Sequence, residues 1–226
     1  MTSSVPQKPF ERRRLQQRDA TRRAILQATD TLLVEEGVER FSMRRLSDRC
    51  GYTAPTIYHH FGDKNGLLDA LIDERFRRLL VTLRGRPRGK SQLSTLRAMA
   101  ESFVQFGLEH PAHFHLVTSR KPNGSEPLPS LEEVRELFVE ILARLGERGL
   151  LNAHSPSEAG QSLWAMLHGL VSLRIYRPEI GWSETLVQTS LDALLGGLVR
   201  SDLEDPDRPQ RRRAALASCG SREDTQ

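Results

Sequence analysis

The chain has 226 residues, 38% of them apolar, and a formal net charge of +4. This length and apolar content are ordinary for a globular protein and exclude a chain that is disordered throughout. No apolar run approaches the roughly 18 residues of a membrane span, and the N-terminus lacks the apolar stretch of a signal peptide. We therefore expect a cytoplasmic protein that does not bind membranes. Cys50 and Cys219 lie far apart and predict neither a disulfide framework nor a zinc site.

The positive charge is concentrated in the first quarter of the chain. Residues 8–64 carry twelve basic and eight acidic side chains, whereas the rest of the chain carries twenty-one of each. This asymmetry is typical of a polyanion-binding head on a neutral body. Charged segments are more often simply solvated, so charge alone favours nucleic acid only weakly.

Three short helices are predicted in this basic region. Residues 1–17 are rich in Pro, Gln and Arg without an apolar period, and we expect a flexible basic arm there. Apolar residues then recur at helical spacing from residue 18 to Gly37, which suits a helix end. Ser42 can cap a second helix over 43–49, with Phe41 and Leu46 as a hydrophobic staple. A break containing Gly51 leads to a third helix that ends near Gly62. This order predicts a helix-turn-helix domain over residues 18–64.

The rest of the chain predicts helices and loops. Helical patterns cover residues 63–85, 92–110, a short segment after Pro111, 131–149, 155–177 and 183–200, with loops over 85–90 and 119–130. No segment alternates as a strand would. The predicted fold class is therefore all-α, with the helix-turn-helix head followed by a helical ligand-binding and dimerisation bundle over 65–200 and a disordered tail over 201–226.

Two arginines stand where a helix normally disfavours them. Arg44 and Arg45 fall in the first turn of the second helix, where the helix dipole disfavours cations by roughly 0.3 to 1 kcal/mol each. A DNA phosphate bound at that helix end would explain both residues, because it gains backbone N–H groups as well as the guanidinium groups. The alternative is that both side chains bend outward into water.

The third helix, TAPTIYHHF, carries side chains suited to DNA. Ile57 and Phe61 lie four residues apart and are expected to anchor the helix in the core. Hydroxyl and imidazole groups suit phosphates and base edges, and small apolar groups suit a thymine methyl. His60 could equally be a packed core histidine. The expected outward-facing set is Thr53, Ala54, Pro55, Thr56, Tyr58, His59 and His60.

The run from Phe41 to Leu68, FSMRRLSDRCGYTAPTIYHHFGDKNGLL, resembles the DNA-binding head of the TetR/AcrR family of transcriptional regulators. The resemblance implies that the third helix enters the major groove of an operator, with Tyr58 and Lys64 on phosphates. Asn65 stands where the family often has Glu, and Ala54 where it often has a polar residue. The implied DNA-contacting positions are Ser42, Arg44, Thr53, Pro55, Thr56, Tyr58, His59 and Lys64.

A candidate effector site depends mainly on the same resemblance. Trp164 and His168, followed by Gly169, resemble the Trp-x-x-x-His-Gly signature of one class of TetR C-terminal domain, and they share a helix face. Both could instead be core residues, as aromatics at helical spacing usually are. The candidate ligand-binding residues are Phe103, Phe106, Phe114, Phe138, Trp164, His168 and Tyr176.

Helix-turn-helix heads usually act in symmetric pairs, so we expect a homodimer. The helices over 155–177 and 183–200 are the natural interface, which is also what the family implies. The candidate interface residues are Leu186, Leu191, Leu194, Leu195, Gly197 and Leu198. Three closely spaced histidines, His110, His113 and His115, do not share a helix face and have no acidic partner at i+4, so no metal or cofactor is expected. No nucleophile or phosphate-loop motif indicates catalysis.

The sequence thus predicts a DNA-binding regulator, most simply a repressor that a small apolar or amphipathic effector releases from a palindromic operator. One alternative is a regulator without a small-molecule ligand that is controlled by a protein partner. The other is a helical small-molecule-binding enzyme whose basic head is incidental.

Overall fold

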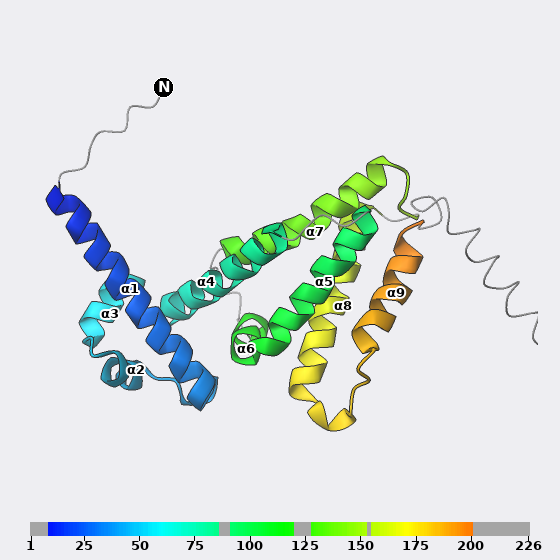
Figure 1. Cartoon of the computed structure of the whole chain (residues 1–226). Helices are drawn as coiled ribbons and strands as arrows, with labels where there is room; N and C mark the ends of the chain where they lie inside the picture. Colours follow the sequence, from blue (N-terminus) through cyan, green and yellow to red (C-terminus); the bar gives the residue numbers. More distant parts are fainter. Residues whose placement is uncertain (1–8, 86–90, 120–127, 153–154, 201–226) are drawn as a thin grey trace, which may run out of the picture. The chain divides into compact units, whose positions relative to one another are not determined.

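The computed structural model describes residues 9–85, 91–119, 128–152 and 155–200 (Figure 1). These residues form helices and no strand, which confirms the predicted all-α fold; a single antiparallel bridge joins Leu151 and Val199. None of the described helices is both long and apolar enough to cross a membrane. The helices are α1 (Pro9–Glu36), η1 (Val38–Arg40), α2 (Met43–Cys50), α3 (Ala54–Phe61), α4 (Lys64–Gly85), α5 (Gln92–Glu109), α6 (Pro111–Ser119), α7 (Pro129–Glu147), α8 (Pro156–Tyr176), η2 (Pro178–Ile180) and α9 (Leu186–Leu198).

The first helix is longer than predicted. Residues 9–17, expected to belong to a flexible arm, are the first turns of α1. They need no apolar period because they cover no core among the described residues: residues 10–20 are all exposed. Arg, Gln and Leu nevertheless favour helix, and a helix already nucleated by its buried half extends without tertiary contacts. Residues 1–8 of the predicted arm and the predicted disordered tail over 201–226 lie outside the described residues.

The chain divides into two compact units whose boundary differs from the predicted one. One unit contains the residues up to Arg78 together with His110–Leu131, and the other contains Leu79–Glu109 and the residues from Glu132 onward. The short helix α6 therefore belongs with the head, because His113 contacts Asp30 of α1. The start of α7 is fixed there too, since Ser130 Oγ donates to the Asp73 carbonyl oxygen of α4 at 2.7 Å. We refer to the two units as the head unit and the body unit.

In the body unit, α5, α8 and α9 pack around a shared apolar core. Leu96 and Phe103 of α5, Leu163 of α8 and Leu191 of α9 are each at most 1% exposed. A capping box opens α8: Ser155 Oγ accepts from the Glu158 backbone N–H, and the Glu158 carboxylate accepts from the Ser155 backbone N–H. Helix α8 therefore begins where its local sequence dictates, and its apolar face meets α5 and α9.

A close backbone approach fixes the turn between α3 and α4. Gly62 ends α3 with φ of +79°, a conformation that side chains disfavour. Asp63 caps α4 by accepting from the Gly66 backbone N–H at 2.8 Å, as its place in the sequence suggests. A Cβ atom on Gly66 would lie 2.2 Å from the Phe61 carbonyl oxygen. Glycine at this position thus allows the end of α3 to rest against the first turn of α4.

Candidate DNA-binding interface

The N-terminus of α2 is built as its sequence predicts. Ser42 has extended backbone geometry, and its Oγ accepts from the Arg45 backbone N–H at 3.3 Å. Phe41 and Leu46, the two staple residues, are 4% and 0% exposed. The cap and the staple together fix where the chain enters α2, and hence where the first turn of α2 presents its side chains.

The two arginines of this first turn have different surroundings in the structure. The guanidinium of Arg45 lies 2.7 Å from a carboxylate oxygen of Glu36, at the end of α1. Arg44 is exposed and forms no ion pair with any residue that the structure describes. An intramolecular partner therefore accounts for Arg45 without DNA, whereas Arg44 keeps its full set of donors for an anion.

Helix α3 presents a polar face beside this site. Ile57 is completely buried and anchors the helix, as predicted, while Tyr58 is 44% exposed. The hydroxyls of Thr53 and Thr56 lie 3.0 Å apart at the start of the helix. The Ser47 hydroxyl donates to the Tyr52 carbonyl oxygen at 2.5 Å and so ties α2 to the turn before α3. The candidate residues that face solvent fully or in part here are Thr53, Ala54, Pro55, Thr56, Tyr58, His59 and His60.

His60 has features of both roles that its position suggested. Its side chain is half-buried beside Phe61, which itself lies 5.1 Å under the guanidinium of Arg22. Burial lowers the pKa of His60, and the charges of His59, Arg18 and Arg22 lower it further. The neutral imidazole is therefore favoured, and it can accept a hydrogen bond as well as donate one.

Lys64 is exposed, and its ammonium contacts the residue that comes just before the cap of α2. Its ammonium donates to the Phe41 carbonyl oxygen at 3.2 Å and lies 5.3 Å from the centre of the Phe41 ring. An ammonium has three donors, so two remain for a phosphate. These contacts place a positive charge beside the capped end of α2, where Arg44 also lies.

Of the seven candidate ligand-binding residues, four come together in the body unit. The Phe103 ring centre lies 5.2 Å from that of Trp164 and 5.4 Å from that of His168, and the Trp164 and His168 rings are 4.6 Å apart. Phe138 joins this aromatic cluster at 6.3 Å from Phe103. Burial lowers the pKa of His168 to about 4. Trp164 and His168 therefore lie side by side, as their spacing on one helix predicted. Helices α5, α7 and α8 all contribute residues to the cluster.

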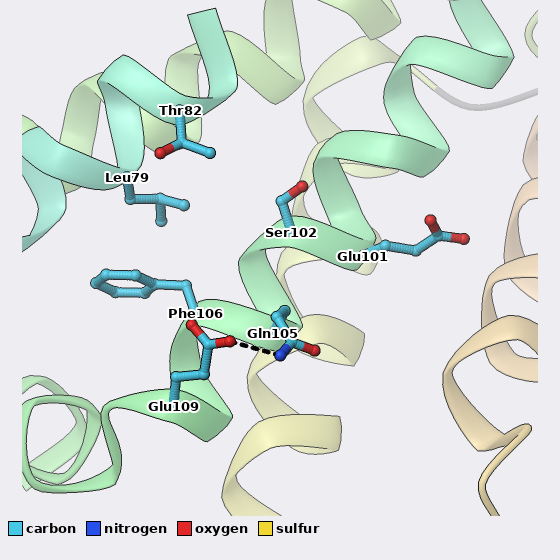
Figure 2. A pocket seen from close by; sticks show the side chains of 7 residues that line it. All are labelled: Leu79, Thr82, Glu101, Ser102, Gln105, Phe106 and Glu109. Carbon is cyan, nitrogen blue, oxygen red and sulfur yellow. Dashed lines mark hydrogen bonds between the residues drawn. The ribbon is translucent and has the colours of Figure 1, made fainter. Parts of the chain in front are cut away.

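The other three candidates lie elsewhere. Phe114 belongs to α6 in the head unit, and Tyr176 is 45% exposed at the end of α8. Phe106 lines a separate groove of about 320 Å³ between α4 and α5. Figure 2 shows Leu79 and Thr82 of α4 and the ring of Phe106, which extends from α5 toward Leu79, with Gln105 Nε2 donating to Glu109 Oε1 at 2.6 Å. Of the residues that line this groove, only Phe106 was predicted from the sequence. Helical periodicity does not show where two helices move apart and leave a groove between them.

The candidate dimer residues divide into two groups. Leu191, Leu195 and Leu198 are at most 4% exposed within the single chain and pack in its own core, which corrects their assignment to a partner surface. The apolar stripe of α9 faces α5 and α8, as an amphipathic helix does by default. Gly197 is exposed, whereas Leu186 and Leu194 are half-buried.

A buried polar cluster in the head unit was missed by sequence reasoning. His113 of α6 is 1% exposed, and its Nε2 lies 2.7 Å from Oδ1 of Asp30 on α1. Arg75 of α4 pairs with the same carboxylate. Burial lowers the pKa of His113 to about 4, although the charge of Asp30 opposes this shift. The neutral imidazole is therefore favoured beside the carboxylate, and one carboxylate contacts side chains of two further helices, His113 of α6 and Arg75 of α4. No sequence signal links these residues, since Asp30 and Arg75 each fit an ordinary solvated helix face.

Comparisons with known proteins agree with this architecture. The family described as "Bacterial regulatory proteins, tetR family" matches residues 25–71, and "Tetracyclin repressor-like, C-terminal domain" matches residues 96–198. The HTH-type transcriptional regulator BetI of Cronobacter sakazakii is 34% identical over 159 residues, which cover 63% of this chain and 77% of that protein.

Solved structures share the fold. A protein of unknown function from Rhodococcus sp. RHA1 superposes with a TM-score of 0.68 at 24% identity, over 79% of this chain and 95% of that one. RolR in complex with resorcinol gives a TM-score of 0.63 at 17% identity, over 81% and 90% of the two chains. Together with the capped α2, the exposed face of α3 and the matched head and body, these likenesses show that the chain is a DNA-binding transcriptional regulator of the TetR family.

Proposed function

We propose that the protein is a repressor that binds a palindromic operator as a homodimer and is released by a small amphipathic effector. The main support for the proposal is that the exposed face of α3 and the capped first turn of α2 both present polar side chains to solvent. There, Arg44 has no ion pair with another described residue, and Tyr58 and His59 are exposed. Hydroxyl and imidazole groups along α3 and a guanidinium group in the first turn of α2 suit the phosphates and base edges of a major groove.

Dimerisation is supported by the surface of α8 and α9 that the single chain leaves open. Leu173 and Tyr176 of α8 are 48% and 45% exposed. On α9, a Cβ atom on Gly196 or Gly197 would meet nothing within 4 Å. Gly197 lies near the start of α8, where Asn152 Nδ2 donates to its carbonyl oxygen, whereas Leu173 and Tyr176 lie in the last turn of α8. The open surface therefore offers apolar residues at one end of the helix pair and small residues at the other, and this surface, rather than the buried leucines of α9, is the proposed interface.

Two features of the body unit support an effector site there. The aromatic cluster around Phe103 offers apolar and ring-stacking contacts, and the groove beside Phe106 adds hydroxyl, amide and carboxylate groups. A small molecule with an apolar face and a few polar groups would satisfy both surfaces. Such a molecule can release DNA only if it binds the DNA-free arrangement of the dimer more tightly than the DNA-bound one.

The test begins with selection of a duplex from a random pool by the wild-type protein at a stated salt concentration. We expect the selected sequence to be palindromic, with half-sites about one helical turn apart. Arg44→Ala and Tyr58→Phe should each weaken binding to that duplex. Arg144→Ala serves as the control, because Arg144 is an exposed residue of α7 whose guanidinium pairs with Glu140. Normal binding by Arg44→Ala and Tyr58→Phe would overturn the proposed contacts.

A further inference from the structure

The exposed start of α1 carries a row of arginines that continues from the proposed DNA-binding face. Arg14, Arg18 and Arg22 are spaced four residues apart, so they follow one another along the same side of the helix. Residues 10–20 are all exposed, and this stretch of helix covers none of the core. A surface with no packing role and a row of cations is available to a partner.

Contacts at the inner end of the row show which side of the head unit it follows. The guanidinium of Arg22 lies 5.1 Å above the ring of Phe61, the last residue of α3. The charges of Arg18 and Arg22 also act on His60 of α3. The row therefore starts at the C-terminal end of α3 and continues away along α1, whose N-terminal turns extend beyond α3 in Figure 1.

We propose that Arg14 and Arg18 bind phosphates of the operator backbone next to the groove that α3 enters, so that the start of α1 is a second DNA-contacting element. Two features of the row indicate duplex DNA as its partner: its positive charge and its continuity with the exposed face of α3. Glu11 lies on the same side of the helix, yet the row from Glu11 to Arg22 keeps an excess of positive charge. Duplex DNA presents a negative charge about every 1.7 Å of its axis, which a row of cations matches without reading any base. This inference rests on the proposed function, because it assumes that α3 lies in the groove.

The helix offers its own matched control. Arg12 and Arg13 lie in the same exposed turns but on the opposite side of α1 from the row. The variants Arg14→Ala/Arg18→Ala and Arg12→Ala/Arg13→Ala therefore remove equal charge from the same segment. Alanine is the strongest helix former, so both variants should keep the helix, which far-ultraviolet circular dichroism checks.

Binding is measured by fluorescence anisotropy at several salt concentrations, with the duplex selected by the wild-type protein and a scrambled duplex of the same composition. For Arg14→Ala/Arg18→Ala we expect the slope of log K against log salt to become shallower by about 1.8, that is, about 0.9 per phosphate contact. Affinity for both duplexes should fall by a similar factor. Arg12→Ala/Arg13→Ala should change the slope by less than half as much.

Three outcomes would overturn the inference. Equal slopes for the two double variants would mean that only the total charge matters, and an unchanged slope for Arg14→Ala/Arg18→Ala would mean that the row does not touch DNA. In both of these cases the wild-type protein still binds its selected duplex, so the proposed function stands. If the wild-type protein selects no duplex, the proposed function fails and this inference fails with it.

Discussion

The head and the body of this protein hold their candidate functional residues in opposite ways. In the head, Arg44, Tyr58 and His59 are on the surface and are positioned by contacts between residues close in sequence, such as the Ser42 cap. In the body, Phe103 and Phe138 are buried, and the aromatic cluster they form with Trp164 draws on three helices far apart in the chain. Changes in the head should therefore alter binding more than folding, and changes in the body should do the reverse.

The largest effect is expected in the body from Phe103→Ala. Phe103 is 1% exposed and contacts the rings of Phe138, Trp164 and His168. Truncating a buried Phe lowers the free energy of unfolding by about 3–5 kcal/mol, through lost burial and the cavity left behind. Urea denaturation at one fixed protein concentration measures this change, because the stability of the proposed dimer would depend on concentration.

Phe106→Ala is the matched control on the same helix. Phe106 is half-buried and lines the open groove of Figure 2, so its removal leaves no closed cavity. We expect it to lower stability clearly less than Phe103→Ala does. Equal losses for the two variants would show that the cluster is not the core of the body and would weaken the contrast between the two units.

The next effect compares one histidine from each unit, the buried His113 and the half-buried His168. The pKa values of His113 and His168 are both lowered to about 4 by burial, against about 6.5 in an unfolded chain. Between these values the unfolded state binds more protons, so stability is complete above about pH 6.5 and is lost as the pH falls toward 4. Each histidine should lower the free energy of unfolding by about 2 kcal/mol at pH 5 relative to pH 7.5.

Single His113→Gln and His168→Gln variants separate the two contributions. Each should reduce the difference between the urea stabilities at pH 7.5 and pH 5 by about the same amount, although His113 contacts Asp30 and His168 lies among aromatic rings. If His168→Gln alone changes the pH dependence, then the attraction between His113 and Asp30 outweighs burial in the head.

The sequence predicted the head in detail because its determinants are local. The cap by Ser42, the staple of Phe41 and Leu46, and the anchor Ile57 each depend on residues within a few positions of one another. All-α architecture and the approximate helix ranges followed from periodicity in the same way. The start of α1 was predicted wrongly because periodicity detects packing, and residues 10–20 form an exposed stretch of helix.

What escaped prediction depends on contacts between distant segments. No local pattern indicates that Asp30 contacts both His113 and Arg75, so the place of α6 in the head unit was missed. It also could not show which side of α9 faces its own chain, and three core leucines were assigned to a partner. Trp164 and His168 were paired correctly because they share one helix face, whereas Phe103 reaches them only through the fold.

The smallest effect is expected at the helix caps, because a serine caps one helix in each unit. Ser42 caps α2 in the head, and Ser155 caps α8 in the body through a full capping box. Replacing either by Ala should lower the free energy of unfolding by about 1 kcal/mol. Only Ser42→Ala should also weaken binding to the duplex selected by the wild-type protein, since that cap positions the turn carrying Arg44. Urea denaturation and anisotropy on the same samples measure both quantities. Equal losses of DNA affinity in the two variants would mean that capping affects binding only through overall stability. That result would contradict a direct contact between the first turn of α2 and DNA.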